Sequence, residues 1–398
     1  MSTASFTAAP LTITGAQVWD GERFERRDLH LADGMVSEHS HPDADVLHGT
    51  GLWVVPGLID AHFHAYATSM GGFENERGPL SYAALNGARR LTRALQRGFT
   101  TVRDVAGGDI GLAQAIDAGL FPSPRYHFTG PALSQTGGHG DPRAAHVDVC
   151  FSHGHMCEVV DGVDALRVAV RERLRTGAHA IKVMASGGVF SLTDPIRVPQ
   201  YSPEELRAVV DEATRRGSYV AAHAYSSEAV QHAVQAGIRS IEHGNLIDEA
   251  TAAMMAEAGA FLVPTLAAYE AMDRRGAEIG LNAVSLAKNA EVLAKGQDAV
   301  RLAHDAGVRV GFGSDLMGDL EDDQLAGVRL QVEASGAART LQSMTVVNAA
   351  LIGDAALGHL RPGAYGDAVL LASDPLTDPS ALWREDARRA VIRSGVRI

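Results

Sequence analysis

Eight short apolar runs alternate with helix-length segments through most of this chain, and this alternation is the feature that most constrains its fold. The predicted strands span residues 58–64, 100–102, 125–129, 180–184, 219–223, 238–243, 261–264 and 308–313. The predicted helices span residues 82–96, 164–175, 203–216, 227–235, 248–258 and 290–306. Such alternation is typical of a parallel sheet whose strands are joined by helices. Eight units predict an α/β fold of the (β/α)8 TIM-barrel type, with a doubly wound open sheet as the alternative.

The two ends of the chain have a different pattern. Residues 1 to about 55 contain short strands such as Leu11–Thr14 and Leu52–Val55, and nothing there resembles a long helix. After Asn348 the pattern returns to strands, of which Gly366–Leu371 is the clearest. We therefore predict a small β-sandwich domain formed by both chain termini, residues 1–55 and 358–398, beside a barrel domain of residues 56–357.

Composition limits the classes of function. The chain has 398 residues and a formal net charge of −13, which argues against a nucleic-acid binder because such proteins need a basic face. Its two cysteines, Cys150 and Cys157, are too few for a disulfide framework. Residues 1–10 do not look like a signal peptide, and no run approaches the roughly 18 apolar residues of a membrane helix. We expect a cytoplasmic protein without nucleic-acid or membrane partners.

Two histidines end the first predicted barrel strand. His62 and His64 are two residues apart, so in a strand their side chains point to the same face. Two neutral imidazoles on one face make the first half of a zinc site. The alternative is that one histidine lies in the core while the other faces solvent.

Further ligand-type side chains follow at the ends of later strands, where a barrel places its active site. They are Lys182, His223, His243 and Asp315. Each has an ordinary explanation by itself, as a buried hydrogen-bonded histidine or an aspartate that caps a helix. Together they predict a metal site at one rim. Burial near cations favours a neutral Lys182 amine, which can take up CO₂ to form a carbamate; alternatively, Lys182 pairs with a neighbouring acid.

Several of these motifs resemble those of one family, the amidohydrolase superfamily, over about residues 10–395. The segment Pro56–His64 is similar to the superfamily's first-strand signature, and Lys182 with Met184–Val189 resembles its carbamylated-lysine strand. The remaining matches are His223-Ala224-Tyr225, Glu242-His243-Gly244-Asn245 and Gly313-Ser314-Asp315. Within the superfamily the chain is most similar to the imidazolonepropionase-like, prolidase-type branch of metal-dependent dipeptidases and amidases.

The resemblance implies a site for two divalent metal ions, with zinc as the expected metal. It implies that His62, His64 and Asp315 hold the buried ion and that His223 and His243 hold the more exposed one. A carbamate on Lys182 and a hydroxide would bridge the two ions, which acidify bound water and polarise a carbonyl. Asp315 would act as the base and then carry a proton to the leaving amine.

Three other side chains are candidates for contacting a substrate. His139 lies in the glycine-rich segment Gly137–Asp141, which can bring it over the site to stabilise an oxyanion. Tyr225 follows His223 by two residues, so its hydroxyl can bind a substrate carbonyl or carboxylate. Arg197, in the loop of residues 190–201, is expected to clamp a substrate carboxylate, or else to be a solvated loop arginine. Cys150, His153, His155 and Cys157 are interpreted as part of a lid and not as a second zinc site.

These residues predict a binuclear amidohydrolase that cleaves an amide bond in a small substrate, such as a dipeptide or an N-acyl amino acid. Hydrolysis of a cyclic amide, an imidazolone ring, a lactone or a carbamate on the same site is the alternative. Deamination is disfavoured because the superfamily's deaminases place a glutamate where this chain has Ser226. A homologue without catalysis is also disfavoured, because no ligand is missing. We expect a homo-oligomer whose partner is a small-molecule substrate.

Overall fold

The computed structural model describes residues 9–191 and 194–398 of the chain. Residues 1–8, on which the signal-peptide prediction mostly rests, lie outside the described part, as do Leu192 and Thr193 of the 190–201 loop. Within the described residues, no helix combines the length and apolar character needed to cross a membrane. The cytoplasmic location remains a prediction.

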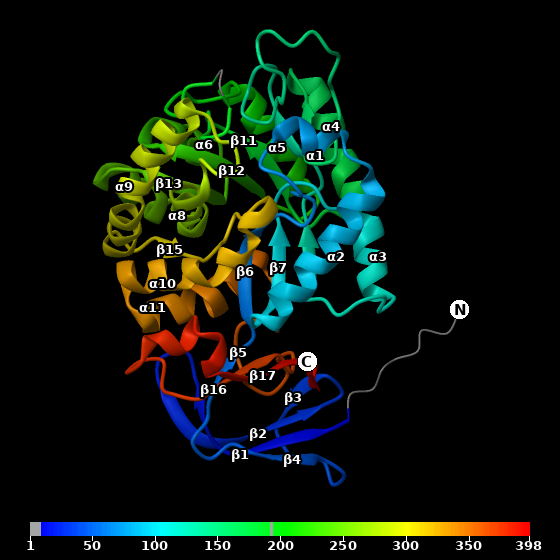
Figure 1. The fold of residues 1–398 in the computed structure, drawn as a ribbon, viewed down its shortest axis with the longest axis vertical. Coiled ribbons are helices and arrows are strands. Elements are labelled where there is room, and N and C mark those ends of the chain that lie inside the picture. The colour runs from blue at the N-terminus through cyan, green and yellow to red at the C-terminus, as the bar shows by residue number, and fades with distance from the viewer. Residues whose placement is uncertain (1–8, 192–193) are drawn as a thin grey trace.

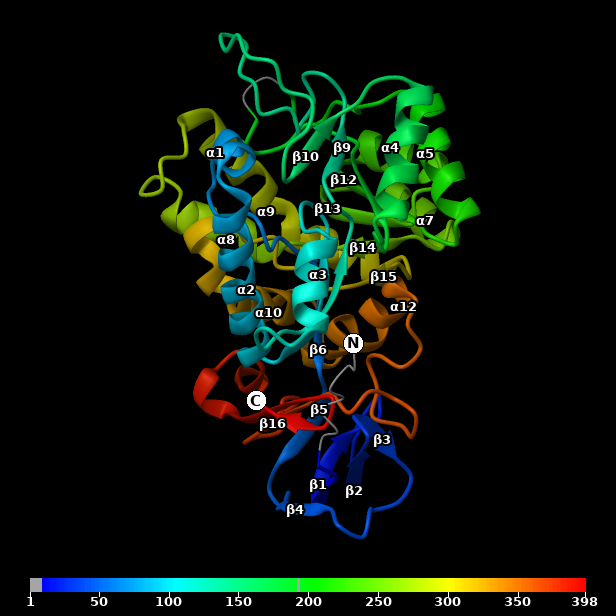
Figure 2. The ribbon, with the colours of Figure 1, turned by 90° about the vertical axis from the view of Figure 1, so that its right-hand side faces the viewer.

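The body of the protein is an α/β structure built on parallel strands (Figures 1 and 2). One parallel sheet contains β6 (Leu58–Phe63), β7 (Phe99–Asp104) and β8 (Arg125–Phe128) in that order. A second sheet has the strand order β10-β9-β11-β12-β13-β14-β15. Its strands are β9 (Ala132–Ser134), β10 (Cys157–Val159), β11 (Ile181–Met184), β12 (Val220–Ser226), β13 (Ser240–Leu246), β14 (Phe261–Val263) and β15 (Arg309–Val310). The prediction of a parallel α/β architecture is therefore confirmed.

Backbone hydrogen bonds connect both edge strands of the three-stranded sheet to the second sheet. Beyond β15, the carbonyl of Phe312 accepts a bond of 2.9 Å from the Ala61 amide of β6. On the other side, the His179 amide before β11 donates to the Phe128 carbonyl of β8 at 2.7 Å. The two sheets are thus joined at two places without forming one continuous hydrogen-bonded sheet.

Helices surround the strands and bury their outer faces (Figure 1). They are α1 (Gly72–Arg77), α2 (Leu80–Gln96), α3 (Ile110–Asp117), α4 (Val163–Arg175), α5 (Pro203–Arg215), α6 (Ser227–Gln235), α7 (Glu249–Glu257), α8 (Leu266–Arg275), α9 (Ala283–Asp305), α10 (Gln324–Ser335), α11 (Ala337–Gln342) and α12 (Asn348–Ile352). The short helical turns η1 (Gly318–Asp323), η2 (Ser343–Val347), η3 (Pro379–Leu382) and η4 (Glu385–Ala387) connect some of them. α5 shows why the sequence folds this way: Ser202 and Glu205 form a capping box, and its apolar face joins the largest buried cluster.

Both chain ends contribute to a third sheet, and Figures 1 and 2 show the blue and red strands side by side beneath the α/β body. Its strands are β1 (Leu11–Trp19), β2 (Phe24–Ala32), β3 (Met35–Ser37), β4 (Asp45–His48), β5 (Trp53–Pro56), β16 (Ala368–Leu371), β17 (Arg388–Arg393) and β18 (Val396–Arg397). β5 joins the two ends, because it pairs with β1 and with β16. The sheet has an apolar cluster of its own, which includes Ile13, Leu29 and Ile392. This layout is consistent with the predicted terminal domain.

Some predicted boundaries were wrong. β12 and β13 continue to Ser226 and Leu246, so His223 and His243 lie inside strands and not at their last residue. β15 has only two residues; after it, the Gly311 amide still donates to Leu262 of β14, while the Phe312 carbonyl accepts from Ala61 of β6. The sequence also gave no indication of β9 and β10, whose three-residue length is too short for a periodic pattern.

Candidate metal centre and active site

The predicted ligands converge on one cavity of about 130 Å³. All six of them line it: His62, His64, Lys182, His223, His243 and Asp315. His139 and Tyr225 line the same cavity. It opens beside a larger outer chamber of about 630 Å³, which shares His139 and Phe190 with it. Side chains from strands far apart in the sequence are therefore gathered around a single small space.

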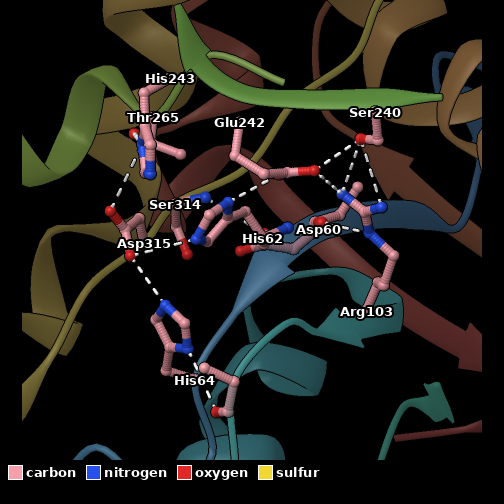
Figure 3. A network of polar contacts seen from close by, with 12 residues as sticks. Asp60, His62, His64, Arg103, Ser240, Glu242, His243, Thr265, Ser314 and Asp315 are labelled. Atoms are coloured by element: carbon pink, nitrogen blue, oxygen red, sulfur yellow. Dashed lines mark hydrogen bonds and ion pairs between the residues drawn. The ribbon is translucent and has the colours of Figure 1, made fainter. Parts of the chain in front are cut away.

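The first-strand histidines meet at the carboxylate of Asp315 (Figure 3). His64 Nε2 lies 2.9 Å from Asp315 Oδ1, and His62 Nε2 lies 3.3 Å from the same oxygen. His64 Nδ1 contacts the Ala106 carbonyl at 3.3 Å, which turns its other nitrogen toward the cavity. The expectation that both side chains point to one side is confirmed by these contacts.

The backbone is unusual at two of the converging residues. Asp315 has φ 54° and His243 has φ 77°, values that non-glycine residues rarely adopt. The Asp315 amide donates to the His62 carbonyl at 2.8 Å, which holds the residue against β6. Burial acts to raise the pKa of Asp315, but His62 and its other polar contacts outweigh burial and hold that pKa well below its usual range. Asp315 is therefore a carboxylate at neutral pH.

A second carboxylate lies behind His62 (Figure 3). His62 Nδ1 is 2.7 Å from Glu242 Oε2, while Arg103 Nη2 donates to Glu242 Oε1 at 2.7 Å. Ser240 Oγ donates to the same oxygen at 2.5 Å, and the Arg103 and Glu242 side chains are fully buried. A carboxylate on Nδ1 makes that nitrogen a donor and turns Nε2 toward Asp315 and the cavity. The role of Glu242 behind His62 was not predicted from the sequence.

His243 is held by a chain of hydroxyl groups. Thr265 Oγ1 donates to Tyr269 Oη at 3.1 Å, and Tyr269 Oη donates to Tyr225 Oη at 3.0 Å. His243 Nδ1 lies 2.7 Å from Thr265 Oγ1 and 2.8 Å from Tyr269 Oη. Because both hydroxyl protons are directed elsewhere, Nδ1 must be the donor here and Nε2 keeps its lone pair. Thr265 and Tyr269 were not found from the sequence, because they lie in the chain after β14 and form no local motif.

His223 and Lys182 complete the wall of the cavity. His223 Nε2 lies 3.2 Å from the Gly187 carbonyl. Burial, followed by the neighbouring His139, holds the pKa of His223 well below its usual range, so the ring is neutral at pH 7. Burial also lowers the pKa of Lys182 to about 8, although Glu242 and Asp315 oppose this shift. A neutral amine is therefore much more accessible at this lysine than at an exposed one.

The glycine-rich loop does bring His139 to the cavity. Its ring stacks on His223 with a centroid separation of 4.2 Å and an interplanar angle of 20°. On its other side, His139 Nδ1 lies 3.6 Å from Asp194 Oδ2. Gly188 packs against the imidazole, because a Cβ atom at Gly188 would lie 2.0 Å from His139 Cε1. The loop after β11 thus fixes where His139 sits.

Arg197 is not brought into this cavity. Its guanidinium pairs with Glu291 of α9, and its side chain lines a separate surface pocket together with Asn245 and Lys295. The expected carboxylate clamp is therefore corrected: the loop turns away after Ser186 pairs with Pro199, which directs Arg197 outward. The solvated-arginine alternative describes its position better.

The segment of residues 150–157 does not gather its cysteines and histidines. Cys150 is exposed, whereas Cys157 is buried and lines the cavity. His153 pairs with Glu158, and His155 Nε2 contacts the Gly78 carbonyl at 3.0 Å. Among the described residues, the one group of three or more potential ligands with close donor atoms is His62, His243 and Asp315, whose atoms lie within 4.8 Å of one another. Imidazole nitrogens and a carboxylate are ligand types that suit a divalent metal such as Zn²⁺.

Comparison with known proteins agrees with this geometry. The chain matches the amidohydrolase family over residues 53–398. It is 35% identical over 365 residues to an ochratoxinase of Aspergillus niger, a match that covers 86% of this chain and 75% of the relative. A prolidase complexed with N-methylphosphonate-L-proline has a TM-score of 0.94 at 40% identity, covering 98% of this chain and 99% of the other. A Xaa-Pro dipeptidase with bound methionine has a TM-score of 0.87 at 27% identity, covering 98% and 100% of the two chains.

Proposed function

The chain belongs to the amidohydrolase family and is a hydrolase of carbon–nitrogen bonds, and we propose that it cleaves a peptide-like amide in a small substrate, such as a dipeptide or an N-acyl amino acid. The observation that carries the proposal is the convergence of four histidines, Lys182 and Asp315 on one cavity. The similarity to an ochratoxinase and to prolidases favours an amide over a lactone or a carbamate.

The donor set supports binding of two divalent ions, with Zn²⁺ as the expected metal. We assign His62, His64 and Asp315 to one ion, and His223 and His243 to the other. The depressed pKa of Lys182 supports a carbamate there, which would supply a shared carboxylate-like ligand. When bound, such a pair lowers the pKa of water and polarises a carbonyl.

The protein's own side chains are assigned to moving protons and holding the substrate. Asp315, an ionised carboxylate within 3.3 Å of two histidines, takes a proton from the attacking water. As the bond from carbon to nitrogen breaks, Asp315 returns that proton to the leaving nitrogen. His139 reaches the cavity from the glycine-rich loop of residues 137–141 and donates to the oxyanion. Tyr225 accepts from Tyr269, so its own proton is available for a substrate carbonyl or carboxylate oxygen.

The hydrogen bonds that join both edges of the three-stranded sheet to the second sheet support the finer architecture that the sequence predicts. We propose that residues 56–357 form a closed (β/α)8 barrel, with the catalytic cavity at one rim. Residues 1–55 and 358–398 form the composite β-sandwich domain. Its mixed sheet contains β5, the strand directly before β6 in the chain.

Metal analysis combined with a substrate screen tests the proposal. The protein, purified with zinc, should contain about two metal ions per chain. It should hydrolyse at least one class among dipeptides and N-acyl amino acids, with lactones, carbamates and cyclic amides as the comparison set. Protein that retains no metal after purification with excess zinc would contradict the proposed function. So would protein that is active only on the comparison set.

A further inference from the structure

Two loops meet beside the catalytic cavity, and one buried side chain joins them. The glycine-rich loop of residues 137–141 carries His139, and the loop after β11 contains Gln200. The His139 amide donates to Gln200 Oε1 at 3.0 Å, and Gln200 Nε2 donates to Asp194 Oδ2 at 3.2 Å. Gln200 is 5% exposed and Asp194 is 4% exposed, so water does not compete for these bonds. Gln200 therefore bridges the backbone of His139 and a buried carboxylate.

The two partners of Gln200 fix the direction of its side-chain amide. A backbone N–H only donates and a carboxylate only accepts, so the amide oxygen must face His139 and the nitrogen must face Asp194. Burial acts to raise the pKa of Asp194, but the neighbouring His139 and Lys288 outweigh burial and lower that pKa. Asp194 is thus an ionised acceptor, and the bridge has a single polarity.

The backbone on both sides of the bridge is held in place. The Gln200 amide donates to the Ala185 carbonyl at 2.8 Å, directly after the strand β11 that carries Lys182. On the other side, Gly138 allows the close approach of the two loops, because a Cβ atom there would lie 2.7 Å from Gln200 Oε1. The bridge therefore ties His139 to the end of β11.

The same carboxylate also controls the ring of His139. Asp194 Oδ2 accepts a bond of 3.2 Å from the Gly188 amide as well as the bond from Gln200. Gly188 is the residue that packs against the His139 imidazole, whose other face stacks on His223. One buried oxygen thus organises the contact to the backbone of His139 and the contact to its ring.

We propose that Gln200 is a positioning residue, which acts through His139 and sets where that imidazole stands beside the reacting carbonyl, with Asp194 as its anchor. Gln200 is not one of the described residues that line the inner cavity or the outer chamber, so it does not itself touch a substrate. A catalytic group displaced by about 1 Å can lose about 10²-fold in rate, which makes such a bridge consequential. The inference rests on the proposed function for the role of His139, but not for the position of His139.

Crystal structures test the position of His139 without turnover. The full-length, zinc-loaded wild type is compared with Gln200→Met, which has a similar length and makes neither bond, and with Gln200→Asn, which is one methylene shorter and reaches only one partner. In both variants the His139 ring should move relative to His223 by about 1 Å or more, the scale that matters for a catalytic group. Gln200→Asn keeps a buried polar amide, so it decides the result if Gln200→Met does not fold. A ring that stays in its wild-type place in every folded variant overturns the inference.

A double-mutant cycle then tests whether Gln200 acts through His139. Gln200→Met, or Gln200→Asn in its place, should lower kcat by about 10–100-fold while KM changes little, because a displaced donor no longer meets the oxyanion. In a His139→Ala background the same substitution should cost no more than about threefold, since the group that it positions is already absent. Equal losses in the two backgrounds would show that Gln200 acts independently of His139 and would overturn the inference.

Gln342→Met is the matched control. Gln342 is a half-buried glutamine of α11 whose Nε2 donates to the Gly21 carbonyl at 2.9 Å, and it lines neither the inner cavity nor the outer chamber. This variant should keep both the His139 position and kcat, and a loss of kcat that matches that of Gln200→Met would contradict a specific role for Gln200. If His139 moves in the Gln200 variants while the wild type cleaves no amide, the positioning role stands and the proposed function fails. If amides are cleaved and the ring does not move, the inference alone fails.

Discussion

Glu242 Oε2 lies 2.7 Å from His62 Nδ1, and both side chains are buried in the centre of the strands. The same carboxylate pairs with Arg103 (Figure 3). Arg103 also donates to the Ala61 carbonyl at 2.6 Å. Burial acts to raise the pKa of Glu242, but Arg103 and His62 outweigh it and hold that pKa far below its usual range. A permanent anion therefore stands behind His62 and sets which ring nitrogen faces the cavity.

Glu242→Gln is expected to weaken metal binding by about 10–100-fold, because an amide no longer fixes the His62 tautomer. It also leaves the buried Arg103 guanidinium without its counter-ion, so the free energy of unfolding should fall by about 3–5 kcal/mol. Chelator competition on folded protein measures the metal affinity, and denaturant unfolding measures the stability.

Glu321→Gln is the matched control for Glu242→Gln. Glu321 is 6% exposed and pairs with Arg89, Arg90 and Arg93, but it does not line the cavity. We expect this variant to lose stability while it keeps its metal affinity. The same loss of metal affinity in both variants would show that Glu242 acts through general stability alone.

Lys182→Ala is expected to lose the metal pair together with activity, because the variant has no amine to form the proposed carbamate. A short carboxylic acid with bicarbonate should restore part of the activity. Metal content by atomic absorption is the measurement, with Lys295→Ala as the control, since Lys295 lines a separate surface pocket outside the cavity. Wild-type metal content and turnover in Lys182→Ala would end the carbamate assignment.

Asp315→Asn is expected to lower kcat by about 10²–10⁴-fold while KM changes much less, because an amide cannot take up and return the proton. Steady-state kinetics on the best amide substrate measures this, with metal content determined on the same sample. If the variant retains its metal and more than about a tenth of the wild-type kcat, Asp315 is not the proton carrier.

Much of this arrangement was predictable because the strands of the parallel sheets are local signals. A buried strand such as Leu58–Phe63 is a continuous apolar run, and residues two apart must share a face, so His62 and His64 could be placed together without coordinates. The later proposed ligands were found because parallel strands present their carboxyl ends at one edge. Alternation of strand and helix was enough to bring Lys182 and Asp315 to the same place.

What the sequence did not reveal depends on contacts between segments far apart. Tyr269 reaches Tyr225 and His243 only because α8 begins directly beneath the cavity, and no spacing in the chain encodes that approach. The position of Arg197 was predicted wrongly for a related reason, because contacts with distant segments determine the path of a loop. Here Lys288 of α9 donates to the Gly188 and Asp194 carbonyls and helps fix that loop.

Tyr269→Phe is expected to lower kcat/KM by about 3–10-fold, because Tyr225 loses the donor that fixes its hydroxyl. His243 Nδ1 keeps Thr265 as a partner, so metal content should change little. Tyr201→Phe removes another buried hydroxyl, which donates to the Val160 carbonyl at 2.9 Å outside the cavity. This control should lose comparable stability without a change in kinetics. Matching kinetic losses in both variants would contradict a positioning role for Tyr269.

A pair of histidines away from the cavity makes stability sensitive to acid. His127 and His179 have ring centroids 4.7 Å apart, and in the described part of the chain the Nε2 atoms of both are buried without a hydrogen-bond partner. Burial lowers the pKa of His127 to about 4 and that of His179 to about 3. Both values lie below the usual 6.5 or so of an unfolded chain.

The sign of the effect follows from these pKa values. Above about pH 6.5 both histidines are neutral in the folded and unfolded states, so their contribution to stability is fully present. As the pH falls toward 4, the unfolded chain binds protons that the folded chain does not, and the free energy of unfolding falls by up to about 1.4 kcal/mol per pH unit for each histidine. His127→Gln removes one titrating ring and should reduce that slope by about 1.2 kcal/mol per unit between pH 6 and 4.5.

Urea unfolding at several pH values measures the slope, and the same substitution at the exposed His41 is the control. An unchanged slope in His127→Gln would mean that this histidine binds its proton equally well in both states.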